Sequence, residues 1–136
     1  MYLEDTRPMI QGLSKLARSG GIVSVLTKNA SALAARPALE GRYRDALAAL
    51  ETDRDRGRLG VMTRGDTFEG LSEAFADAGL TVERWYGVRV FADHLDDGMP
   101  GEDLPEILNL EWEAGKRDPY RSVARLIHVV GRKRPV

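Results

Sequence analysis

The stretch RSGGIVSVLTKN, residues 18–29, constrains the fold more than any other part of the chain. A Gly-Gly pair there opens an apolar run from Ile22 to Leu26 that only Ser24 interrupts. Its length and β-branched residues favour a strand over a helix, and the lack of polar alternation is typical of a strand covered on both faces. We therefore expect a buried strand with a neighbour on each side, close to the amino end of the sequence.

A helix is predicted before this strand, over residues 6–17. Apolar side chains at helical spacing give it one apolar face: Met9, Ile10, Leu13 and Leu16. Pro8 suits the first turn of a helix. Ser19-Gly20-Gly21 ends the helix, because glycine readily adopts the left-handed backbone conformation found at helix ends.

Two short helices are predicted in the Ala- and Leu-rich residues 30–51, with Arg36-Pro37 as the interruption between them. The second has an apolar face made by Tyr43, Ala46, Leu47 and Leu50. Residues 52–65 are charged and Gly-rich, and this composition predicts a loop.

The clearest helix covers Asp66 to Ala78. Asp66 and Glu69 have the spacing of a capping box, and Gly79 ends the helix. Its apolar face contains Phe68, Leu71, Phe75 and Ala78.

Two further strands are predicted in the second half of the chain. Residues 80–91 form one of them, with a bulge at Gly87, and residues 92–102 form a loop. A helix follows, with an apolar face made by Leu104, Ile107, Leu108 and Trp112. Residues 125–132 form the last strand. The order helix, strand, helices, helix, strand, helix, strand is an α/β pattern.

Composition excludes several classes of chemistry. A chain of 136 residues is one domain or part of one. The 20 Lys and Arg against 21 Asp and Glu create no overall field toward DNA or a membrane. The absence of cysteine excludes disulfides, thiolate nucleophiles and thiolate metal sites. No apolar run could cross a membrane and the amino terminus is no signal peptide, so we expect a cytoplasmic location.

Motifs for metal, nucleotide or serine chemistry are missing from the sequence. Asp93, His94, Asp96 and Asp97 supply suitable metal ligands, but their spacing matches no known pattern and favours a polar surface loop. We therefore expect no metal site. The sequence has no G-x-S-x-G elbow, and it has neither of the Gly-rich phosphate loops, G-x-G-x-x-G and G-x-x-x-x-G-K-[ST].

Aromatic and basic side chains are the remaining candidates for binding. His128 lies in an apolar strand, which fits either a hydrogen-bonded core histidine or a histidine at a substrate pocket. Trp85, Tyr86 and Arg89 lie along one strand in alternating directions. One face of that strand is therefore expected to be core, and the other a cleft wall or an interface.

Arginine far outnumbers lysine. Its planar guanidinium suits carboxylate and phosphate recognition, although genome composition together with a solvated surface is the favoured explanation of the excess. Tyr120 and Arg121 follow Pro119, and they either contact an anionic group or form a turn with an aromatic anchor.

Taken together, the segments resemble the carboxy-terminal part of class I S-adenosylmethionine-dependent methyltransferases. MYLED is similar to the end of the segment after the family's fourth strand, and LARSGGIVSVLTKN is similar to its helix, Gly-Gly turn and fifth strand. TFEGLSEAFADAGLTVERWYGVRVF resembles the penultimate helix and strand, and ARLIHVVGRK the final strand.

One branch of that family is closer. KNASAL, YGVRVFADHL and RDPYRSVARLIHVVGRK are similar to the bacterial enzymes that methylate the carboxyl group of 5-carboxymethoxyuridine at the tRNA wobble position, and to their actinobacterial relatives. The resemblance covers essentially the whole chain.

The resemblance implies an α/β fold that is the C-terminal part of a Rossmann-like, seven-stranded sheet. Three strands lie in this chain, the last of them antiparallel, with helices, and the first half is missing. Residues 1–136 are then a single partial domain on the substrate side. The E/D-x-G-x-G loop of the cofactor half does not occur in the sequence, so we expect a truncated or misassigned gene start, or a fragment.

The resemblance also implies the chemistry and the site. The methyl group of S-adenosylmethionine is already activated, so such an enzyme supplies proximity and alignment. A carboxylate acceptor is already a nucleophile and needs a cationic clamp, for which Arg is the better residue. No catalytic residue is assigned, and Tyr2 falls on the cofactor side. The candidates for the acceptor side are Asn29, Arg64, Arg89, Tyr120, Arg121, Arg125 and His128.

Two alternatives stay open. Leu126 stands where the tRNA-modifying branch has an aromatic residue, which leaves a small carboxylate or hydroxyl compound as a second acceptor. A basic stripe for tRNA is offered by Arg54, Arg56, Arg58 and Arg64, diluted by Asp53 and Asp55. The other alternative is a non-catalytic interaction domain. An exposed apolar strand edge pairs with another chain, which predicts a homo-oligomer.

Overall fold

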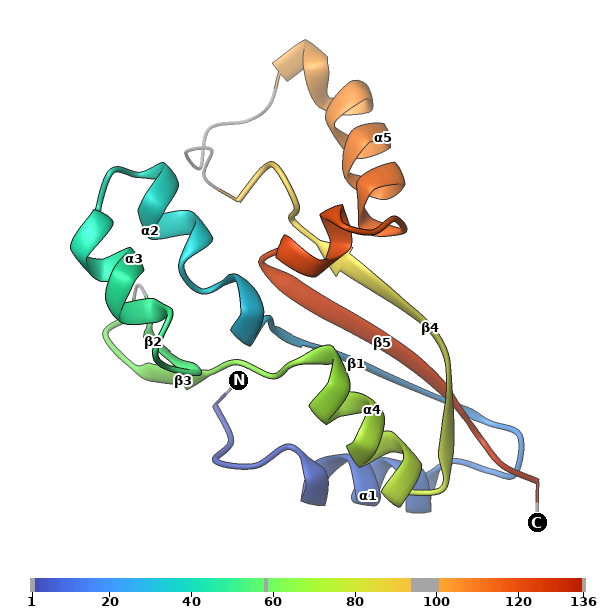
Figure 1. The fold of residues 1–136 in the computed structure, drawn as a ribbon. Coiled ribbons are helices and arrows are strands. Elements are labelled where there is room, and N and C mark those ends of the chain that lie inside the picture. Colours follow the sequence, from blue (N-terminus) through green and yellow to red (C-terminus); the bar gives the residue numbers. More distant parts are fainter. Residues whose placement is uncertain (1, 58, 94–100, 136) are drawn as a thin grey trace.

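The computed structural model describes residues 2–57, 59–93 and 101–135. Its centre is a three-stranded sheet in the order β1–β5–β4, formed by β1 (Ile22–Lys28), β5 (Leu126–Lys133) and β4 (Leu80–Val88) (Figure 1). β5 runs antiparallel to both neighbours. The predicted α/β composition, the three strands and the antiparallel last strand are confirmed.

Two helices, α1 (Arg7–Leu16) and α4 (Phe68–Asp77), lie side by side and cover one face of this sheet (Figure 1). The core between them and the sheet contains Ile10, Val23, Val25, Leu71, Ala74, Phe75, Leu80, Ile127 and Val129. Phe75 lies directly over β5 at Gly131, where a Cβ atom would be only 2.5 Å from the ring. A glycine is therefore required at that contact.

The predicted apolar face of α1 is only partly buried. Ile10 is fully buried, but Leu16 is 87% exposed, and Ser14 takes the second inward position. Ser14 is buried because its hydroxyl donates to the backbone carbonyl of Ala78 at 2.7 Å, so a hydrogen bond at the end of α4 replaces an apolar contact.

The prediction that β1 is covered on both faces is wrong. Val23, Val25 and Thr27 point into the core, whereas Ile22 and Leu26 are each 55% exposed on the opposite face. The reason is that α1 and α4 lie on the same side of the sheet (Figure 1). Among the described residues, the outer edge of β1 pairs with no strand.

Two short helices, α2 (Ala35–Leu39) and α3 (Tyr43–Ala49), follow the 3-10 turn η1 (Ala30–Ala32). Arg36-Pro37 does not divide them, because proline is tolerated in the first turn of α2. The break comes at Gly41, which has a φ of 75°. Only Ala46 of the predicted apolar face of α3 is buried; the exposed members are Tyr43, Leu47 and Leu50.

The loop predicted at residues 52–65 is wrong, because this segment contains a hairpin of β2 (Arg54–Arg56) and β3 (Met62–Arg64). The strands are short and charged, so they lack the alternation of apolar and polar residues by which a strand is recognised in a sequence. Asp55 pairs with Thr63 across the hairpin, and both accept hydrogen bonds from the buried Lys28.

Smaller corrections concern caps and bulges. Thr67, and not Asp66, caps α4, with its hydroxyl accepting from the Gly70 amide at 3.1 Å. The irregularity of β4 lies between Val82 and Arg84, and not at Gly87. Gly87 instead permits close approach, since a Cβ atom there would lie 2.7 Å from Cα of Arg121.

The remaining elements lie near the carboxyl end of β4 (Figure 1). They are η2 (Gly101–Asp103), α5 (Leu104–Gly115) and η3 (Tyr120–Val123). No helix in the described part of the chain is both long and apolar enough to span a bilayer.

Candidate functional site

The carboxyl ends of β1 and β4 meet the start of β5 at one end of the sheet. Leu126 is in register with both Lys28 and Val88, so Asn29, Arg89 and Arg125, which extend these three strands, come together there. In open α/β sheets this is the end at which ligands bind.

A buried carboxylate, Asp93, lies among three arginines at this end, and we call Arg36, Arg89 and Arg125 the arginine cluster. Asp93 is 8% exposed. Its oxygens are 3.2 Å from Nε of Arg89, 3.6 Å from a terminal nitrogen of Arg36 and 3.8 Å from Nε of Arg125. Neither oxygen accepts a hydrogen bond from the described residues. The carboxylate therefore balances charge but leaves the guanidinium donors largely uncommitted to it.

The cluster continues through Asp55 on the hairpin. Asp55 pairs with Arg125 at 3.3 Å and with Lys28 at 3.0 Å, and Lys28 also donates to Thr63 at 2.6 Å. Burial acts to raise the pKa of Asp55, but the hydrogen bonds and charges of Lys28 and then Arg125 outweigh it and hold that pKa below its usual value. Asp55 is thus ionised and fixes one side of Arg125.

A cavity of about 580 Å³ opens beside the cluster, between α2, α3 and the hairpin. Its charged lining consists of Arg36, Arg42, Arg56 and Arg125 against Glu40, Asp45 and Asp55. Hydrogen bonds from Arg36 and Arg42 lower the pKa of Glu40 to about 2. The cavity therefore carries a small excess of positive charge, suited to an anionic ligand.

Arg89 has an unusual backbone, with a φ of 60° in the left-handed region. Such strain persists only where the surroundings impose it, and it concentrates at functional sites. Here Glu111 on α5 accepts from the amides of Val90, Phe91 and Ala92 at 2.7–2.8 Å, which fixes the turn directly after Arg89. The Arg89 side chain is 50% exposed and is the most accessible member of the cluster.

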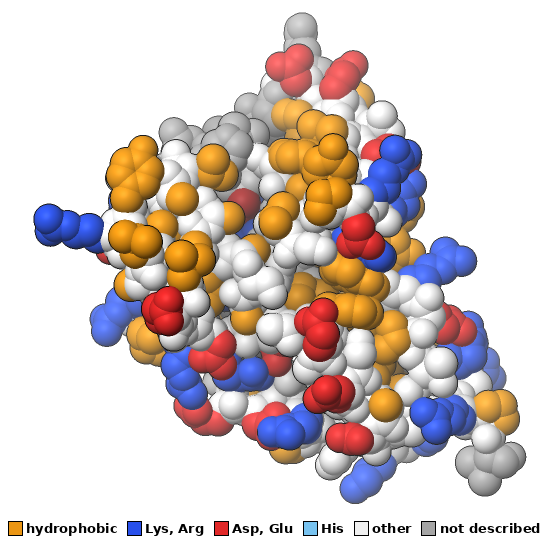
Figure 2. Space-filling view, in the orientation of Figure 1, with side chains coloured by type: hydrophobic (Ala, Val, Ile, Leu, Met, Phe, Trp, Pro, Cys, Tyr) orange, Lys and Arg blue, Asp and Glu red, His pale blue; other side chains and the backbone are white. Residues whose placement is uncertain are grey.

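An exposed aromatic pair lies next to this turn. The rings of Phe91 and Tyr120 meet edge to face with centroids 5.9 Å apart, and these residues are 40% and 47% exposed. Val123 and Arg89 both line the narrow cavity around Asp93, which places η3 beside the cluster. Hydrophobic side chains also gather over α2 and α3 and over α5 (Figure 2).

Three of the predicted acceptor residues, Asn29, Arg64 and Arg121, are committed to structural contacts. Asn29 is 2% exposed and donates to the carbonyls of Ser122 and Ala124, both at 2.9 Å. Arg121 pairs twice with Asp118, and its guanidinium lies 4.1 Å from the centre of the Trp85 ring.

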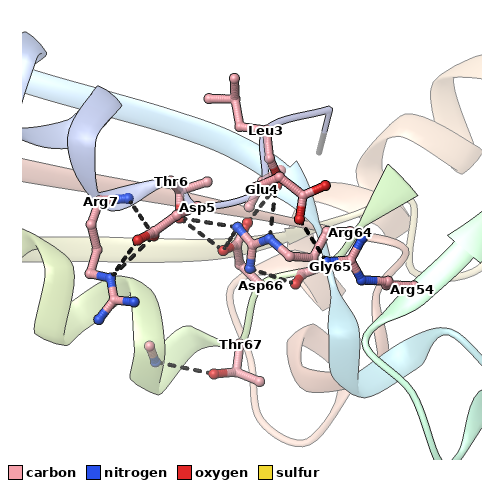
Figure 3. Close-up of polar contacts among 12 residues, drawn as sticks. Leu3, Glu4, Asp5, Thr6, Arg7, Arg54, Arg64, Gly65, Asp66 and Thr67 are labelled. Carbon is pink, nitrogen blue, oxygen red and sulfur yellow. Dashed lines mark hydrogen bonds and ion pairs between the residues drawn. The ribbon is translucent and has the colours of Figure 1, made fainter. Parts of the chain in front are cut away.

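Arg64 belongs to a separate polar cluster that fastens the amino-terminal segment to the sheet (Figure 3). It pairs with Asp66 at 2.8 Å, and Asp66 also accepts from the hydroxyls of Thr6 at 3.0 Å and Thr27 at 2.9 Å. Arg54, one of the stripe predicted for tRNA, pairs with Glu4 in the same region (Figure 3).

His128 lies on the open face of the sheet and is not among the residues that line the cavity around Asp93. Its Nε2 is 2.7 Å from the Ser24 hydroxyl on the neighbouring strand, and its ring is 5.9 Å from that of Tyr86. Of the seven predicted residues, the structure therefore brings Arg89, Arg125 and Tyr120 to one site.

The described residues do not include a recognisable metal or nucleotide site. No group of three metal-ligating side chains exists among the described residues; His94, Asp96 and Asp97 lie outside them. Tyr2 is 66% exposed, and the part of the chain that the structure describes has no Gly-rich turn between a strand and a helix to hold a nucleotide.

Sequence reasoning missed Arg36, Asp93 and Lys28 as parts of the site. In the sequence, Arg36 was interpreted as part of the Arg-Pro interruption between two helices. Asp93 was interpreted as part of a polar surface loop. One signal was available: Lys28 directly precedes Asn29 at the carboxyl end of a buried strand, where ligands of α/β sheets gather.

Comparison with known proteins returned two similar curated proteins. Both are named tRNA 5-carboxymethoxyuridine methyltransferase: one from Escherichia coli O157:H7 is 29% identical over 133 residues, and one from Escherichia coli strain K12 is 29% identical over 135 residues. Each match covers 97% of this chain and 50% of the relative, so the chain spans about half the length of the relatives it matches. No family model matches it. The predicted resemblance to one half of the tRNA 5-carboxymethoxyuridine methyltransferases is thereby confirmed over nearly the whole chain.

Proposed function

We propose that this chain is the acceptor-binding part of an S-adenosylmethionine-dependent methyltransferase, acting in the cytoplasm on a carboxylate of a tRNA wobble uridine. Two findings support the proposal: the similarity to methyltransferases over 97% of the chain, and an arginine cluster at the carboxyl ends of the strands. We propose further that the sheet is the substrate-side portion of a Rossmann-like methyltransferase sheet.

The arginine cluster is the observation that carries the acceptor assignment. A carboxylate that receives a methyl group needs no general base, because its oxygen is already a nucleophile. It needs donors that hold one oxygen in line, and a planar guanidinium does so with two parallel hydrogen bonds. Arg89 and Arg125 have such donors, and Asp93 and Asp55 hold these side chains in place.

The aromatic pair supplies the second part of acceptor recognition. RNA bases outside a helix are held by stacking on aromatic side chains. Phe91 and Tyr120 are half exposed beside Arg89. A uridine stacked there would bring a substituent on its base toward the guanidinium groups.

The cofactor half has to come from another segment, since the described residues form no nucleotide cradle. S-adenosylmethionine supplies the methyl group as an activated sulfonium when it is bound. Calorimetric titration of this chain with S-adenosylmethionine should give no heat of binding, because Tyr2 is its one candidate contact. Micromolar binding of S-adenosylmethionine to this chain would contradict the proposal that another segment binds the cofactor.

The acceptor assignment is tested with two anticodon stem-loop RNAs that differ only in the wobble base, which is 5-carboxymethoxyuridine in one and uridine in the other. Fluorescence anisotropy should show about tenfold tighter binding of the carboxylate RNA, since a charge-assisted hydrogen bond is worth about 1.5–3 kcal/mol. Arg125→Ala should abolish that preference.

The matched control is Arg7→Ala, which removes an equally charged but exposed side chain paired with Asp5. It should lower both affinities equally or leave them unchanged. Equal affinity of the unaltered protein for the two RNAs would refute the carboxylate assignment.

A further inference from the structure

An apolar cavity lies on the open face of the sheet, separate from the cavity between α2, α3 and the hairpin. It occupies about 390 Å³ between α5 and the strands β4 and β5, within the range of natural small-molecule sites. Its walls include Tyr86, Val88, Leu108, Trp112 and His128. Of the arginine cluster, Arg89 also lines this cavity, whereas Arg36 and Arg125 do not.

Two aromatic rings form a platform in this cavity. The rings of Tyr86 and Trp112 are inclined by only 20° with centroids 5.9 Å apart, and the centroid of the His128 ring also lies 5.9 Å from that of Tyr86. Trp112 is 59% exposed. More than half of a large aromatic side chain is therefore open to solvent and available for contact with a planar ring.

The surroundings of the platform are cationic and polar. The Lys116 ammonium lies 5.0 Å from the centre of the Trp112 ring, and Arg89 lines this cavity as well as the narrow cavity around Asp93. The one acidic wall residue, Glu111, already accepts three backbone hydrogen bonds. His128 and Ser24 add a hydrogen-bonding pair.

We propose that this cavity, the Tyr86–Trp112 pocket, binds the base of a nucleotide that neighbours the acceptor nucleotide in single-stranded RNA. Aromatic platforms bordered by cations are the usual means of holding unpaired bases. Arg89 lines both this pocket and the narrow cavity around Asp93, so two adjacent nucleotides could occupy the two places with one arginine between them. The inference rests on the proposed function only in that the acceptor is an RNA.

The two tryptophans of the chain make the pocket directly testable, because they lie on opposite faces of the sheet. Trp112 lines the pocket, whereas Trp85 stacks on Phe68 at 4.4 Å on the core side. Each gives one indole N–H signal in a ¹H–¹⁵N spectrum of the full chain, and the Trp112→Phe variant assigns them. The probe is unmodified hexa-adenylate RNA, which has no carboxyl group.

Titration with this RNA should shift the Trp112 signal and leave the Trp85 signal in place. Trp112→Ala should weaken binding about tenfold, as expected for the loss of one stacked base, and Trp112→Phe should restore most of the affinity. Leu110→Ala is the matched control, since Leu110 is 52% exposed on the same helix and does not line the pocket.

Three outcomes would overturn the proposal: no signal moves at millimolar RNA, the Trp85 signal moves while that of Trp112 does not, or Trp112→Ala binds the RNA as tightly as the unaltered chain. No cofactor or carboxylate takes part in this titration. A failure of the wobble-carboxylate preference therefore leaves its result unaffected, and the two proposals fail separately.

Discussion

Asp66 and Asp93 are two buried aspartates with the same charge, nearly the same exposure and arginine partners, yet their surroundings differ. Asp66 is 7% exposed and Asp93 is 8% exposed. Asp66 accepts hydrogen bonds at 2.8–3.0 Å from Arg64, Thr6 and Thr27. Asp93 has arginine nitrogens at 3.2–3.8 Å and no hydrogen bond from the described residues.

The difference separates a structural cluster from a binding cluster. Around Asp66 the donors are used up, so the cluster fastens the amino-terminal segment to β1 and to the start of α4 (Figure 3). Around Asp93 the arginines are held near one another by charge, and their hydrogen bonds go to other carboxylates, from Arg36 to Glu40 and from Arg125 to Asp55. Buried polar groups without hydrogen bonds are rare and call for a functional explanation.

The largest effect is expected on the free energy of unfolding when one of these two aspartates is replaced. Asp66→Ala should lower the free energy of unfolding by about 3–5 kcal/mol, because it leaves a charged partner buried and unpaired. Asp93→Ala should cost less, about 1–2 kcal/mol, because Arg36 and Arg125 keep Glu40 and Asp55 as partners and Arg89 is half exposed. Urea unfolding of both variants measures the two values. Equal losses of unfolding free energy in the two variants would show that the two clusters have the same structural role.

Arg89 sharpens the comparison, because its backbone strain and its charge can be separated at one position. Arg89→Gly relieves the positive φ and should raise the free energy of unfolding by up to about 1 kcal/mol, while affinity for the carboxylate RNA falls about tenfold. Arg89→Ala removes the same charge but keeps the strain, so it should lose the affinity without gaining stability. An Arg89→Gly chain that binds normally would remove Arg89 from the site.

Asp55 is intermediate between the two aspartates, and its contribution depends on pH. Because its pKa in the folded chain is lowered, its stabilisation is present above the unfolded pKa of about 3.9 and is lost as the pH falls through the folded pKa. Asp55→Asn should cost about 1 kcal/mol at pH 7, since the side chain is one-third exposed. The difference between variant and unaltered chain should vanish on acidification; a constant difference from pH 7 to 2 would contradict this assignment.

The smallest effect on the free energy of unfolding is expected at the outer edge of β1. Among the described residues no strand pairs with this edge, so its backbone N–H and C=O groups are open to a second chain. The homo-oligomer predicted from the sequence would use this edge. Leu26→Lys should change the free energy of unfolding by less than about 0.5 kcal/mol but shift the mass measured by light scattering from dimer to monomer. Leu16→Lys, at an 87% exposed position on α1, should leave the mass unchanged. A monomeric unaltered chain would refute the dimer.

Strands with apolar runs and helices with strong periodicity were predictable from the sequence. Ile22 to Leu26 and the helix containing Phe75 have local signals that burial in the structure matches. The β2–β3 hairpin could not be predicted from the sequence, because its inward residues, Asp55 and Thr63, are polar. They are held by the Nζ atom of Lys28, far away in sequence.

The candidate site was predictable only in part for the same reason. Arg89 and Arg125 follow or precede predicted strands, so topology alone brings them together. Arg36 reaches Asp93 from α2, and no local signal in the sequence shows where this short helix lies against the sheet. His128 was placed with the arginines because the sequence does not reveal which face of a central strand a residue occupies.

The central position of β5 has a consequence for how the chain folds. Both ladders of the three-stranded sheet are made with β5, which follows β1 and β4 along the chain, so these two strands have no partner in this sheet until β5 is synthesised. Ile22 and Arg132, which pair at one end, are nearly the whole chain apart in sequence. Such long-range pairing is slow to form. If synthesis stops before Leu126, the released chain therefore contains β1 and β4 but not the strand with which both form their hydrogen bonds in this sheet.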